Sequence, residues 1–240
     1  MVENGVQFAK MDSYHQMCRW NSGKFYHHPA LKDIRWYWRV EPKVHFFCNV
    51  DYDVFRYMED NNKTYGFVIN IYDSPKSVET LWPQTLEFLA QHPEYIHPNN
   101  ALNWLTDVKN RPGHYREANG YSTCHFWSNF EIGDMNFWRS RAYEDYFEHL
   151  DRAGGFFYER WGDAPVHSIG LGLFEDKNKI HWYPSSSPSS SPGSLSPSLC
   201  ATNRLVGSVI LATNTYRTST AQAAPSAAIA RRGNLRMGGA

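Results

Sequence analysis

Two carboxylates stand out for their surroundings. Glu131 lies inside a run of Phe, Trp and Asn residues in CHFWSNFEIGDMNFWRS, residues 124–140. Asp163 lies in GGFFYERWGDAPVHS, residues 154–168, where glycines, a proline and aromatic residues predict a shaped loop. A sugar-transfer site requires a carboxylate that bonds to the anomeric carbon or stabilises positive charge on the ring, with a base or leaving-group partner nearby. The two segments are candidates for such a site.

Spacing alone favours a simpler interpretation of Glu131. Asn129 would cap a helix, and Glu131 and Asp134 would lie in its first turn, where acidic side chains interact favourably with the helix dipole. His167, close to Asp163, is a metal ligand, a phosphate contact or a hydrogen-bonded core residue, and the last is the commonest role of such a histidine.

Further carboxylates follow strand-like runs: Glu41, then Asp51 with Asp53, then Asp73. Open α/β sheets bind ligands at the ends of strands. The Asp-Tyr-Asp pair suits a divalent cation that holds a nucleotide diphosphate, because hard oxygen ligands suit Mn²⁺ and Mg²⁺. Asp is also common after strands as a turn or cap residue, which is the favoured alternative.

These candidate residues require strands and helices to position them. Runs rich in aromatic and β-branched residues predict strands over 34–40, 44–50 and 64–73. Helical periodicity predicts helices over 77–93, with a kink or restart at Pro83, over 99–107, and over 140–155, which ends in a glycine pair. Residues 167–174 form a buried strand or a short helix. The mixture predicts an α/β layered domain.

Composition narrows the function. The chain has 240 residues, 42% of them apolar and 16% aromatic, and a net charge of zero, so no overall field attracts nucleic acid. The four cysteines include no C-x-x-C pair, and their pairing cannot be read. Sequence signatures of P-loop nucleotidases, serine hydrolases and HExxH zinc proteases are absent.

The composition changes abruptly near residue 183. After residue 182 there is no Asp or Glu and there are five Arg, so residues 1–182 carry five more acidic than basic side chains. Residues 184–200 are rich in Ser and Pro, which predicts a disordered tail. The tail is either a linker or, as we favour, a stretch unrelated to the folded domain, such as frame-shifted coding sequence.

The N-terminal residues 1–16 contain no apolar run that would serve as a signal or membrane anchor, so the chain as written would be cytosolic. The sequon Asn62-Lys63-Thr64 would matter only if the chain enters the secretory pathway.

Several long stretches, among them WYWRVEP, DYDVFRYMEDNNKTYGFVIN, GYSTCHFWSNFEIGDM and HLDRAGGFFYERWGDAPVHSIGLGLF, give the chain a specific resemblance. Over residues 13–182 it resembles the fungal Golgi α-1,2-mannosyltransferases, type II membrane enzymes that extend O- and N-linked mannans. The resemblance implies a GT-A-like nucleotide-sugar-binding mixed sheet with flanking helices. It also implies GDP-mannose as donor, Mn²⁺ as cofactor, a mannose-containing glycan as acceptor, retention of configuration and a lumenal Golgi location.

The resemblance also implies roles for individual residues. It assigns the nucleophile to Glu131 and a supporting catalytic or acceptor-orienting carboxylate to Asp163. Glu41 in WYWRVEP takes a role on the donor or metal side, although Lys43 stands where the family often has Asp, and no metal ligand is assigned. Independently of the resemblance, Tyr26 in SGKFYHHP is a candidate for the rim of the donor site, with a surface loop as the alternative.

Two departures from the family pattern predict an incomplete enzyme. A histidine-bearing segment that follows the KIHW motif in the family is replaced here by the Ser/Pro tail, and the anchor, stem and first strands are not matched. We therefore divide the chain into an extension (1–12), a partial catalytic domain (13–182) and the tail (183–240). The expectation is poor folding and low activity, with an unpaired sheet edge. The alternative function is that of a non-catalytic remnant that binds mannosides.

Overall fold

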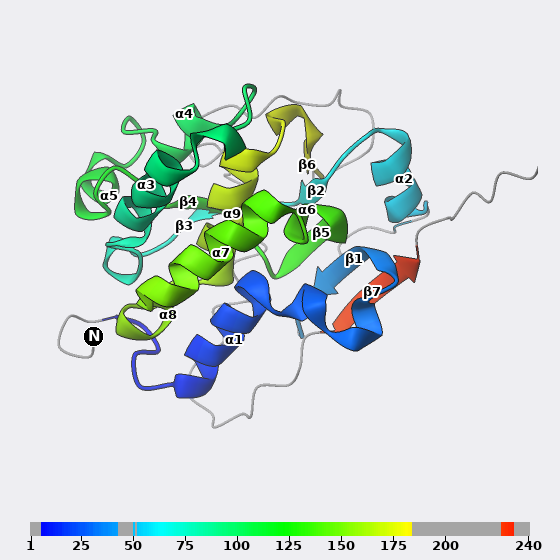
Figure 1. The fold of residues 1–240 in the computed structure, drawn as a ribbon, viewed down its shortest axis with the longest axis horizontal. Helices are drawn as coiled ribbons and strands as arrows, with labels where there is room; N and C mark the ends of the chain where they lie inside the picture. The colour runs from blue at the N-terminus through cyan, green and yellow to red at the C-terminus, as the bar shows by residue number, and fades with distance from the viewer. Residues whose placement is uncertain (1–5, 43–49, 51, 184–226, 233–240) are drawn as a thin grey trace, which may run out of the picture.

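The computed structural model describes residues 6–42, 50, 52–183 and 227–232 (Figure 1). Its main feature is a five-stranded sheet in the order β6-β2-β5-β1-β7. These strands are β1 (Ile34–Val40), β2 (Tyr65–Phe67), β5 (Phe130–Asp134), β6 (Ile180–Trp182) and β7 (Ala227–Arg232). The pair β2 and β6 is parallel and the other neighbouring strands are antiparallel, so the expected mixed α/β sheet with flanking helices is confirmed.

A two-stranded antiparallel sheet pairs β3 (Asn70–Tyr72) with β4 (Cys124–Phe126). The single strand predicted over 64–73 is therefore wrong, because it is divided between β2 and β3 in different sheets. The reason lies in the two residues between them. The carbonyl of Val68 accepts a hydrogen bond from the Trp182 indole, and that of Ile69 accepts one from the backbone N–H of Trp127.

Helices surround the sheets. The α-helices are α1 (Asp12–Gly23), α2 (Val54–Asp60), α3 (Leu81–Gln91), α4 (Leu102–Leu105), α5 (Pro112–Glu117), α6 (Met135–Trp138), α7 (Arg141–Ala153), α8 (Gly155–Tyr158) and α9 (Asp163–Phe174). Short 3₁₀ turns occur at Phe25–His27, Pro29–Leu31, Pro75–Ser77, Pro93–Tyr95 and Lys177–Lys179. Helix α9 is buried along nearly its whole length and lies among the other helices in Figure 1.

The caps explain which helix predictions hold. Helix α7 is confirmed: the Ser140 side chain accepts a hydrogen bond from the N–H of Tyr143, and Gly154 ends the helix in the left-handed conformation with φ 77°. Helix α3 begins at Leu81, later than predicted. Pro83 lies in its first turn, where a missing N–H removes no intrahelical bond. Residues 167–174, left open between strand and helix, belong to α9.

Alternation along β1 divides the core into two parts. Trp36 and Trp38 pack on one face with Ile132 of β5 and with the apolar side of α2. Tyr37 lies on the opposite face, in the larger core that includes buried side chains of α3, α7 and α9. The candidate carboxylate Glu131 alternates with Ile132, so it points to this second, helix-covered face.

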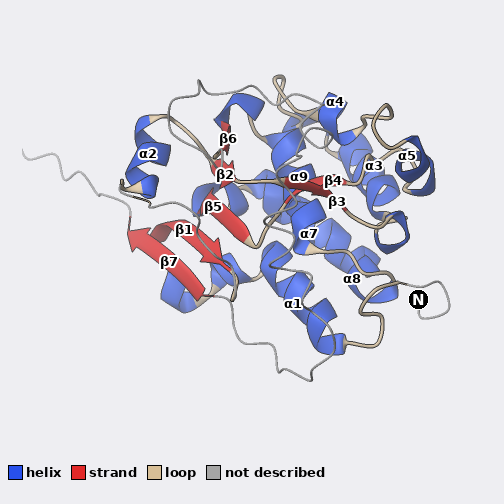
Figure 2. Ribbon diagram, turned by 180° about the vertical axis from the view of Figure 1, so that it is seen from behind, coloured by secondary structure: helices blue, strands red, loops and turns tan. Residues whose placement is uncertain are grey.

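One part of the predicted tail has regular structure. Residues 227–232 form β7 along the outer edge of β1 (Figure 2), and the disorder predicted for the rest of the tail stays a prediction. The backbone groups of an edge strand are free to pair, and six residues of extended backbone satisfy them. This pairing is antiparallel, so the unpaired parallel edge expected from missing early strands stays a prediction. Residues 184–226 and 233–240, and most of the strand predicted over 44–50, lie outside the described part of the chain.

Gly133 of β5 lets aromatic side chains cover the sheet beside Glu131. It stands opposite Tyr37 of β1 and Tyr65 of β2. A methyl group at this position would lie 2.6 Å from the Tyr37 ring and 3.0 Å from the Trp138 indole nitrogen. Because these rings are buried and packed on all sides, they have little room to move.

We expect Gly133→Ala to lower the free energy of unfolding by about 1–3 kcal/mol through overpacking. Urea denaturation measures the change. The matched control is Gly113→Ala in α5, where an added methyl group meets nothing within 4 Å. That substitution should be neutral or slightly stabilising, because Ala favours a helix over Gly. Equal losses in the two variants would contradict the close contact.

Candidate active site

Glu131 lies in the middle strand of the sheet. It faces Arg39 across β1 and Phe67 across β2, and 1% of its surface is exposed. The prediction of a helical first turn capped by Asn129 is therefore wrong. Strand pairing on both sides uses the backbone of β5, and the helix starts only at Met135, where the side chain of Asp134 caps it through the N–H of Asn136.

Two side chains contact one oxygen of Glu131. The Tyr65 hydroxyl donates to Oε2 over 2.9 Å, and Nδ1 of His167 lies 3.1 Å from the same atom. The other oxygen, Oε1, is 3.9 Å from Nη1 of Arg39, which is an ion-pair distance but too long for a hydrogen bond. His167 is therefore the hydrogen-bonded core residue that the sequence favoured.

Asp163, the first residue of α9, shares Arg39 with Glu131. Its Oδ2 accepts hydrogen bonds from Arg39 Nη1 at 2.5 Å and from the Ser128 hydroxyl at 2.9 Å. Burial raises the pKa of this carboxyl, but the charges of Arg39 and His167 and the two hydrogen bonds outweigh burial, so the pKa lies below its ordinary value. Asp163 is thus kept as a carboxylate within 4 Å of the guanidinium that also faces Glu131.

Glu41 lies on the other side of the same guanidinium. Its Oε1 accepts from Nε of Arg39 at 2.8 Å and from Nη2 at 2.6 Å. The structure therefore brings three of the four predicted site residues, Glu131, Asp163 and Glu41, around one arginine. Arg39 is 7% exposed, so these ion pairs are largely shielded from water.

Tyr26, the fourth predicted residue, lies beside α7. Its ring packs against that of Tyr143, and it is 1% exposed. Burial raises the pKa of the Tyr26 hydroxyl, with Glu144 and Glu148 adding to the effect. The alternative of an exposed surface loop is therefore wrong for this side chain. Its contact with a donor stays a prediction.

The other candidate acids lie at structural positions. Asp53 caps α2 by accepting from the N–H groups of Phe55 and Arg56, as the alternative reading of the Asp-Tyr-Asp pair expected. Asp73 pairs with Arg160 at 2.5 Å. Asp51 lies outside the described residues. Within the described ranges, no group of three His, Cys, Asp or Glu side chains is arranged to hold a metal ion.

Three residues that contact the candidate carboxylates were not predicted from the sequence: Arg39, Tyr65 and Ser128. Arg39 carried a signal: in the alternating run of β1 it falls on the same face as Tyr37, so a strand with one buried face would bury this arginine too. A buried arginine requires carboxylate partners. Tyr65 and Ser128 carried no local signal, because their contacts with Glu131 and Asp163 depend on pairing between distant segments.

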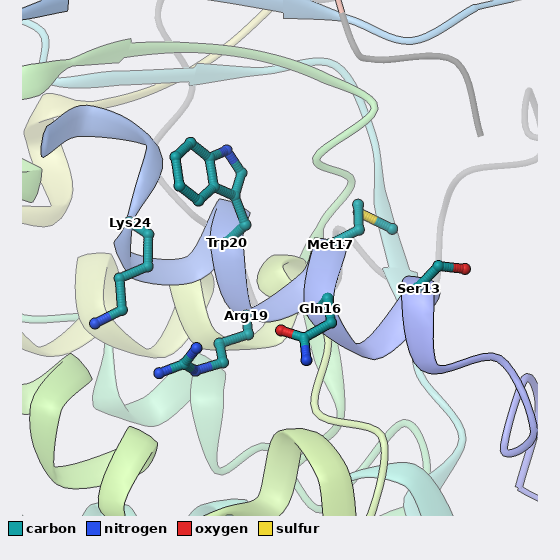
Figure 3. A pocket seen from close by; sticks show the side chains of 6 residues that line it. All are labelled: Ser13, Gln16, Met17, Arg19, Trp20 and Lys24. Atoms are coloured by element: carbon teal, nitrogen blue, oxygen red, sulfur yellow. The ribbon is translucent and has the colours of Figure 1, made fainter. Parts of the chain in front are cut away.

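A surface pocket of about 370 Å³ lies away from these carboxylates, along one side of α1 (Figure 3). Its lining residues are Ser13, Gln16, Met17, Arg19, Trp20 and Lys24. Because none of these side chains belongs to the group around Arg39, the carboxylate site is defined by its charges and not by this pocket. Among the described helices, none is long and apolar enough to cross a bilayer.

The chain matches the family model described as glycolipid 2-alpha-mannosyltransferase over residues 1–198. It is 52% identical over 183 residues to the probable mannosyltransferase KTR4 of Saccharomyces cerevisiae, a match that covers 76% of this chain and 39% of that protein. It is 48% identical to the O-glycoside alpha-1,2-mannosyltransferase omh1 of Schizosaccharomyces pombe, with 76% and 45% covered. The chain thus spans less than half the length of these curated relatives.

Solved structures that are similar to this chain also belong to mannosyl-transferring enzymes. Core-mannan synthase A from Aspergillus fumigatus, crystallised in a Mn/GDP form, has a TM-score of 0.76 and 59% identity, over 83% of this chain and 58% of that one. The mannosyltransferase Ktr4p of S. cerevisiae in complex with GDP has a TM-score of 0.75 and 52% identity, over 76% and 46%. The fold of the described residues is therefore the fold of part of these enzymes.

We expect Asp163→Asn to lower the free energy of unfolding by about 3 kcal/mol at neutral pH, because it removes one partner of a buried ion pair. A group whose pKa is lowered on folding stabilises the protein above its unfolded value, which is 3.8 for Asp. The difference in the free energy of unfolding between wild type and Asp163→Asn should therefore shrink as the pH falls below 3.8 and the native carboxylate takes up a proton. Urea denaturation at about pH 7 and about pH 3 measures it.

The control is Asp60→Asn, which removes an exposed i,i+4 pair with Arg56 and should cost less than about 0.5 kcal/mol. A difference between wild type and Asp163→Asn that stays constant with pH would show that packing, and not charge, is what Asp163 contributes.

Proposed function

Because the chain belongs to the glycolipid 2-alpha-mannosyltransferase family, we propose that it is the part of a retaining α-1,2-mannosyltransferase that carries the catalytic carboxylates. The donor is GDP-mannose and the acceptor is a mannoside. The observation that carries the proposal is the buried Glu131 carboxylate, which Tyr65 and His167 hold by one oxygen beside the Arg39–Asp163 pair. Such a rigid, charged group suits an anomeric carbon that gains positive charge.

The nucleotide and the metal are supported by the relatives. One is a Mn/GDP form and another is a complex with GDP, so we propose GDP-mannose and Mn²⁺ for this family member too. Mn²⁺ would neutralise the diphosphate of the leaving group. The described residues do not form a three-ligand site, and Arg39 already engages Glu41 and Asp163, so we assign no metal ligand and derive no step through the metal.

Two routes to the retained product fit Glu131. In the first, its carboxylate bonds to C1 of mannose as the bond from C1 to the diphosphate breaks, and GDP leaves with the electron pair. The acceptor hydroxyl then bonds to C1, loses its proton to a base and releases Glu131. In the second, the acceptor replaces GDP on the same face in one step while Glu131 stabilises the charge on the ring. We assign Asp163 the role of orienting the acceptor.

We also propose that the enzyme acts on the lumenal side of the Golgi membrane, in protein glycosylation and cell-wall mannan synthesis. The support is the family of the chain together with the exposed position of Asn62, the acceptor of the only N-x-T/S sequon in the sequence. Asn62 lies in the turn after α2, with φ 49°.

The test of the transfer function is release of GDP from GDP-mannose in the presence of Mn²⁺ and methyl α-mannoside. We expect Glu131→Gln to lower kcat by roughly 10³-fold or more, because an amide neither bonds to C1 nor balances its charge. Glu94→Gln, on the exposed Pro93–Tyr95 turn, is the matched control and should keep wild-type activity. Absence of donor binding by wild type at every Mn²⁺ concentration would favour the mannoside-binding remnant instead.

The lumenal location predicts glycosylation of Asn62. Protein expressed in a fungal host should lose mass on treatment with endoglycosidase H, and Asn62→Gln should abolish that loss. Asn62→Gln is a cleaner test than a substitution of Thr64. The Thr64 hydroxyl donates to Glu175 at 2.8 Å, so its removal would also disturb packing. An untreated mass equal to that of the polypeptide would contradict entry of this segment into the lumen.

A further inference from the structure

His167 lies between two hydrogen-bond acceptors. Its Nε2 is 2.9 Å from the backbone carbonyl oxygen of Asn21 in α1, and its Nδ1 is 3.1 Å from Oε2 of Glu131. The ring is fully buried, and Glu131 is 1% exposed. Water therefore cannot serve as a substitute partner for either nitrogen.

The number of protons on this pair follows from its partners. A carbonyl oxygen only accepts, so Nε2 must carry a proton to bond to Asn21. If the histidine is neutral, Nδ1 is then a bare acceptor that faces the carboxylate, and two lone pairs would repel at 3.1 Å. The contact is attractive only if one additional proton lies between Nδ1 and Oε2, so that His167 and Glu131 together carry no net charge.

Tyr65 indicates where that additional proton resides. Its hydroxyl donates to the same Oε2 atom over 2.9 Å. A protonated Oε2 would itself donate to His167 and would be a poor acceptor for Tyr65, whereas a carboxylate oxygen accepts two hydrogen bonds readily. The arrangement therefore favours an imidazolium that donates to an ionised Glu131.

The surroundings of the ring fit a positive charge. The Trp138 ring lies 4.3 Å from it, centroid to centroid, within the range in which an aromatic face attracts a cation. The charged and titratable groups around His167 and Glu131 are Asp163 of α9, Arg39 and Tyr37 of β1, Tyr65 of β2 and Tyr143 of α7. From α1, the group that reaches the ring is the Asn21 carbonyl. Arg39 is shared by the buried carboxylates Glu131 and Asp163 and by the less buried Glu41, so a second cation reduces the net negative charge of this group.

We propose that His167 is a positioning residue that, as an imidazolium, holds Oε2 of Glu131 and leaves Oε1 as the oxygen that meets the anomeric carbon. This role deepens the proposed mannosyl transfer and rests on it. The imidazolium fixes the orientation of the carboxylate and keeps it ionised between turnovers. His167 itself makes no bond to the substrate.

Two substitutions separate this role from a purely structural one. In His167→Asn, the side-chain amide nitrogen takes the place of Nδ1, so a donor to Glu131 is kept and the bond to Asn21 is lost. In His167→Gln, the amide nitrogen takes the place of Nε2, so the bond to Asn21 is kept and the donor to Glu131 is lost. We expect His167→Gln to lower kcat roughly 10- to 100-fold, the effect of losing a hydrogen bond to a charged group.

His167→Asn should stay within about threefold of wild type in kcat, although its tie to α1 is gone. If His167 served only to join α9 to α1, the order would be reversed, with His167→Gln active and His167→Asn impaired; that result overturns the proposal.

Nitrogen NMR of histidine-labelled protein measures the proton count without any activity. In wild type at neutral pH, both ring nitrogens of His167 should be protonated, and the resonance is assigned by its absence in His167→Asn. In Glu131→Gln the ring should become neutral, with its proton on Nε2. A neutral His167 in wild type overturns the proposal even if mannose is transferred. If His167 is charged but the protein releases no GDP, the ion pair with Glu131 is confirmed and the proposed mannosyl transfer is contradicted instead.

Discussion

Arg39 lies between two buried carboxylates, Glu131 and Asp163, and it is the cation that both acids share inside the domain. An isolated carboxylate at such depth would take up a proton, since the cost of burying its charge is several kcal/mol. Arg39 contacts Asp163 directly, lies 3.9 Å from Glu131 and also binds Glu41. A glycosyl-transfer site needs ionised carboxylates at fixed positions. The Arg39 guanidinium contributes to both, because it stabilises negative charge and fixes the position of its partners.

The sheet positions the charged side chains around Arg39. Arg39 and Glu131 face each other on neighbouring strands β1 and β5, and the absence of a side chain at Gly133 lets the rings of Tyr37 and Tyr65 close over them. On the other side, helix α9 supplies both Asp163, at its first residue, and His167, one turn later. One strand pair and one buried helix therefore determine the relative positions of all the charged groups. Tertiary contacts in both core clusters hold these elements in place.

Local sequence features predicted part of this arrangement. Alternation predicted β1 with its bounds, and Ser140 and Gly154 predicted the ends of α7, because the physical causes lie within a few residues of the element. Asp163 and Glu131 were found as candidate acids by their surroundings and by family resemblance. The helical reading of Glu131 failed because its strand is determined by partners on β1 and β2, and Tyr65 could not be recognised before that pairing was known. The strand at residues 227–232 had no local signal for the same reason, since it pairs with the distant edge of β1.

The central claim is that Arg39 and Asp163 act as one electrostatic unit that keeps the site charged. A double-mutant cycle with Arg39→Met and Asp163→Asn, followed by urea denaturation at neutral pH, measures their coupling directly. Arg39→Met leaves the buried Asp163 carboxylate without its cation, whereas Asp163→Asn leaves Arg39 with Glu41 and Glu131; the double variant removes both charges of the pair. We expect the stability lost in the double variant to be smaller than the sum of the two single losses by about 2 kcal/mol or more. Additive losses would contradict the claim that these two charges depend on each other.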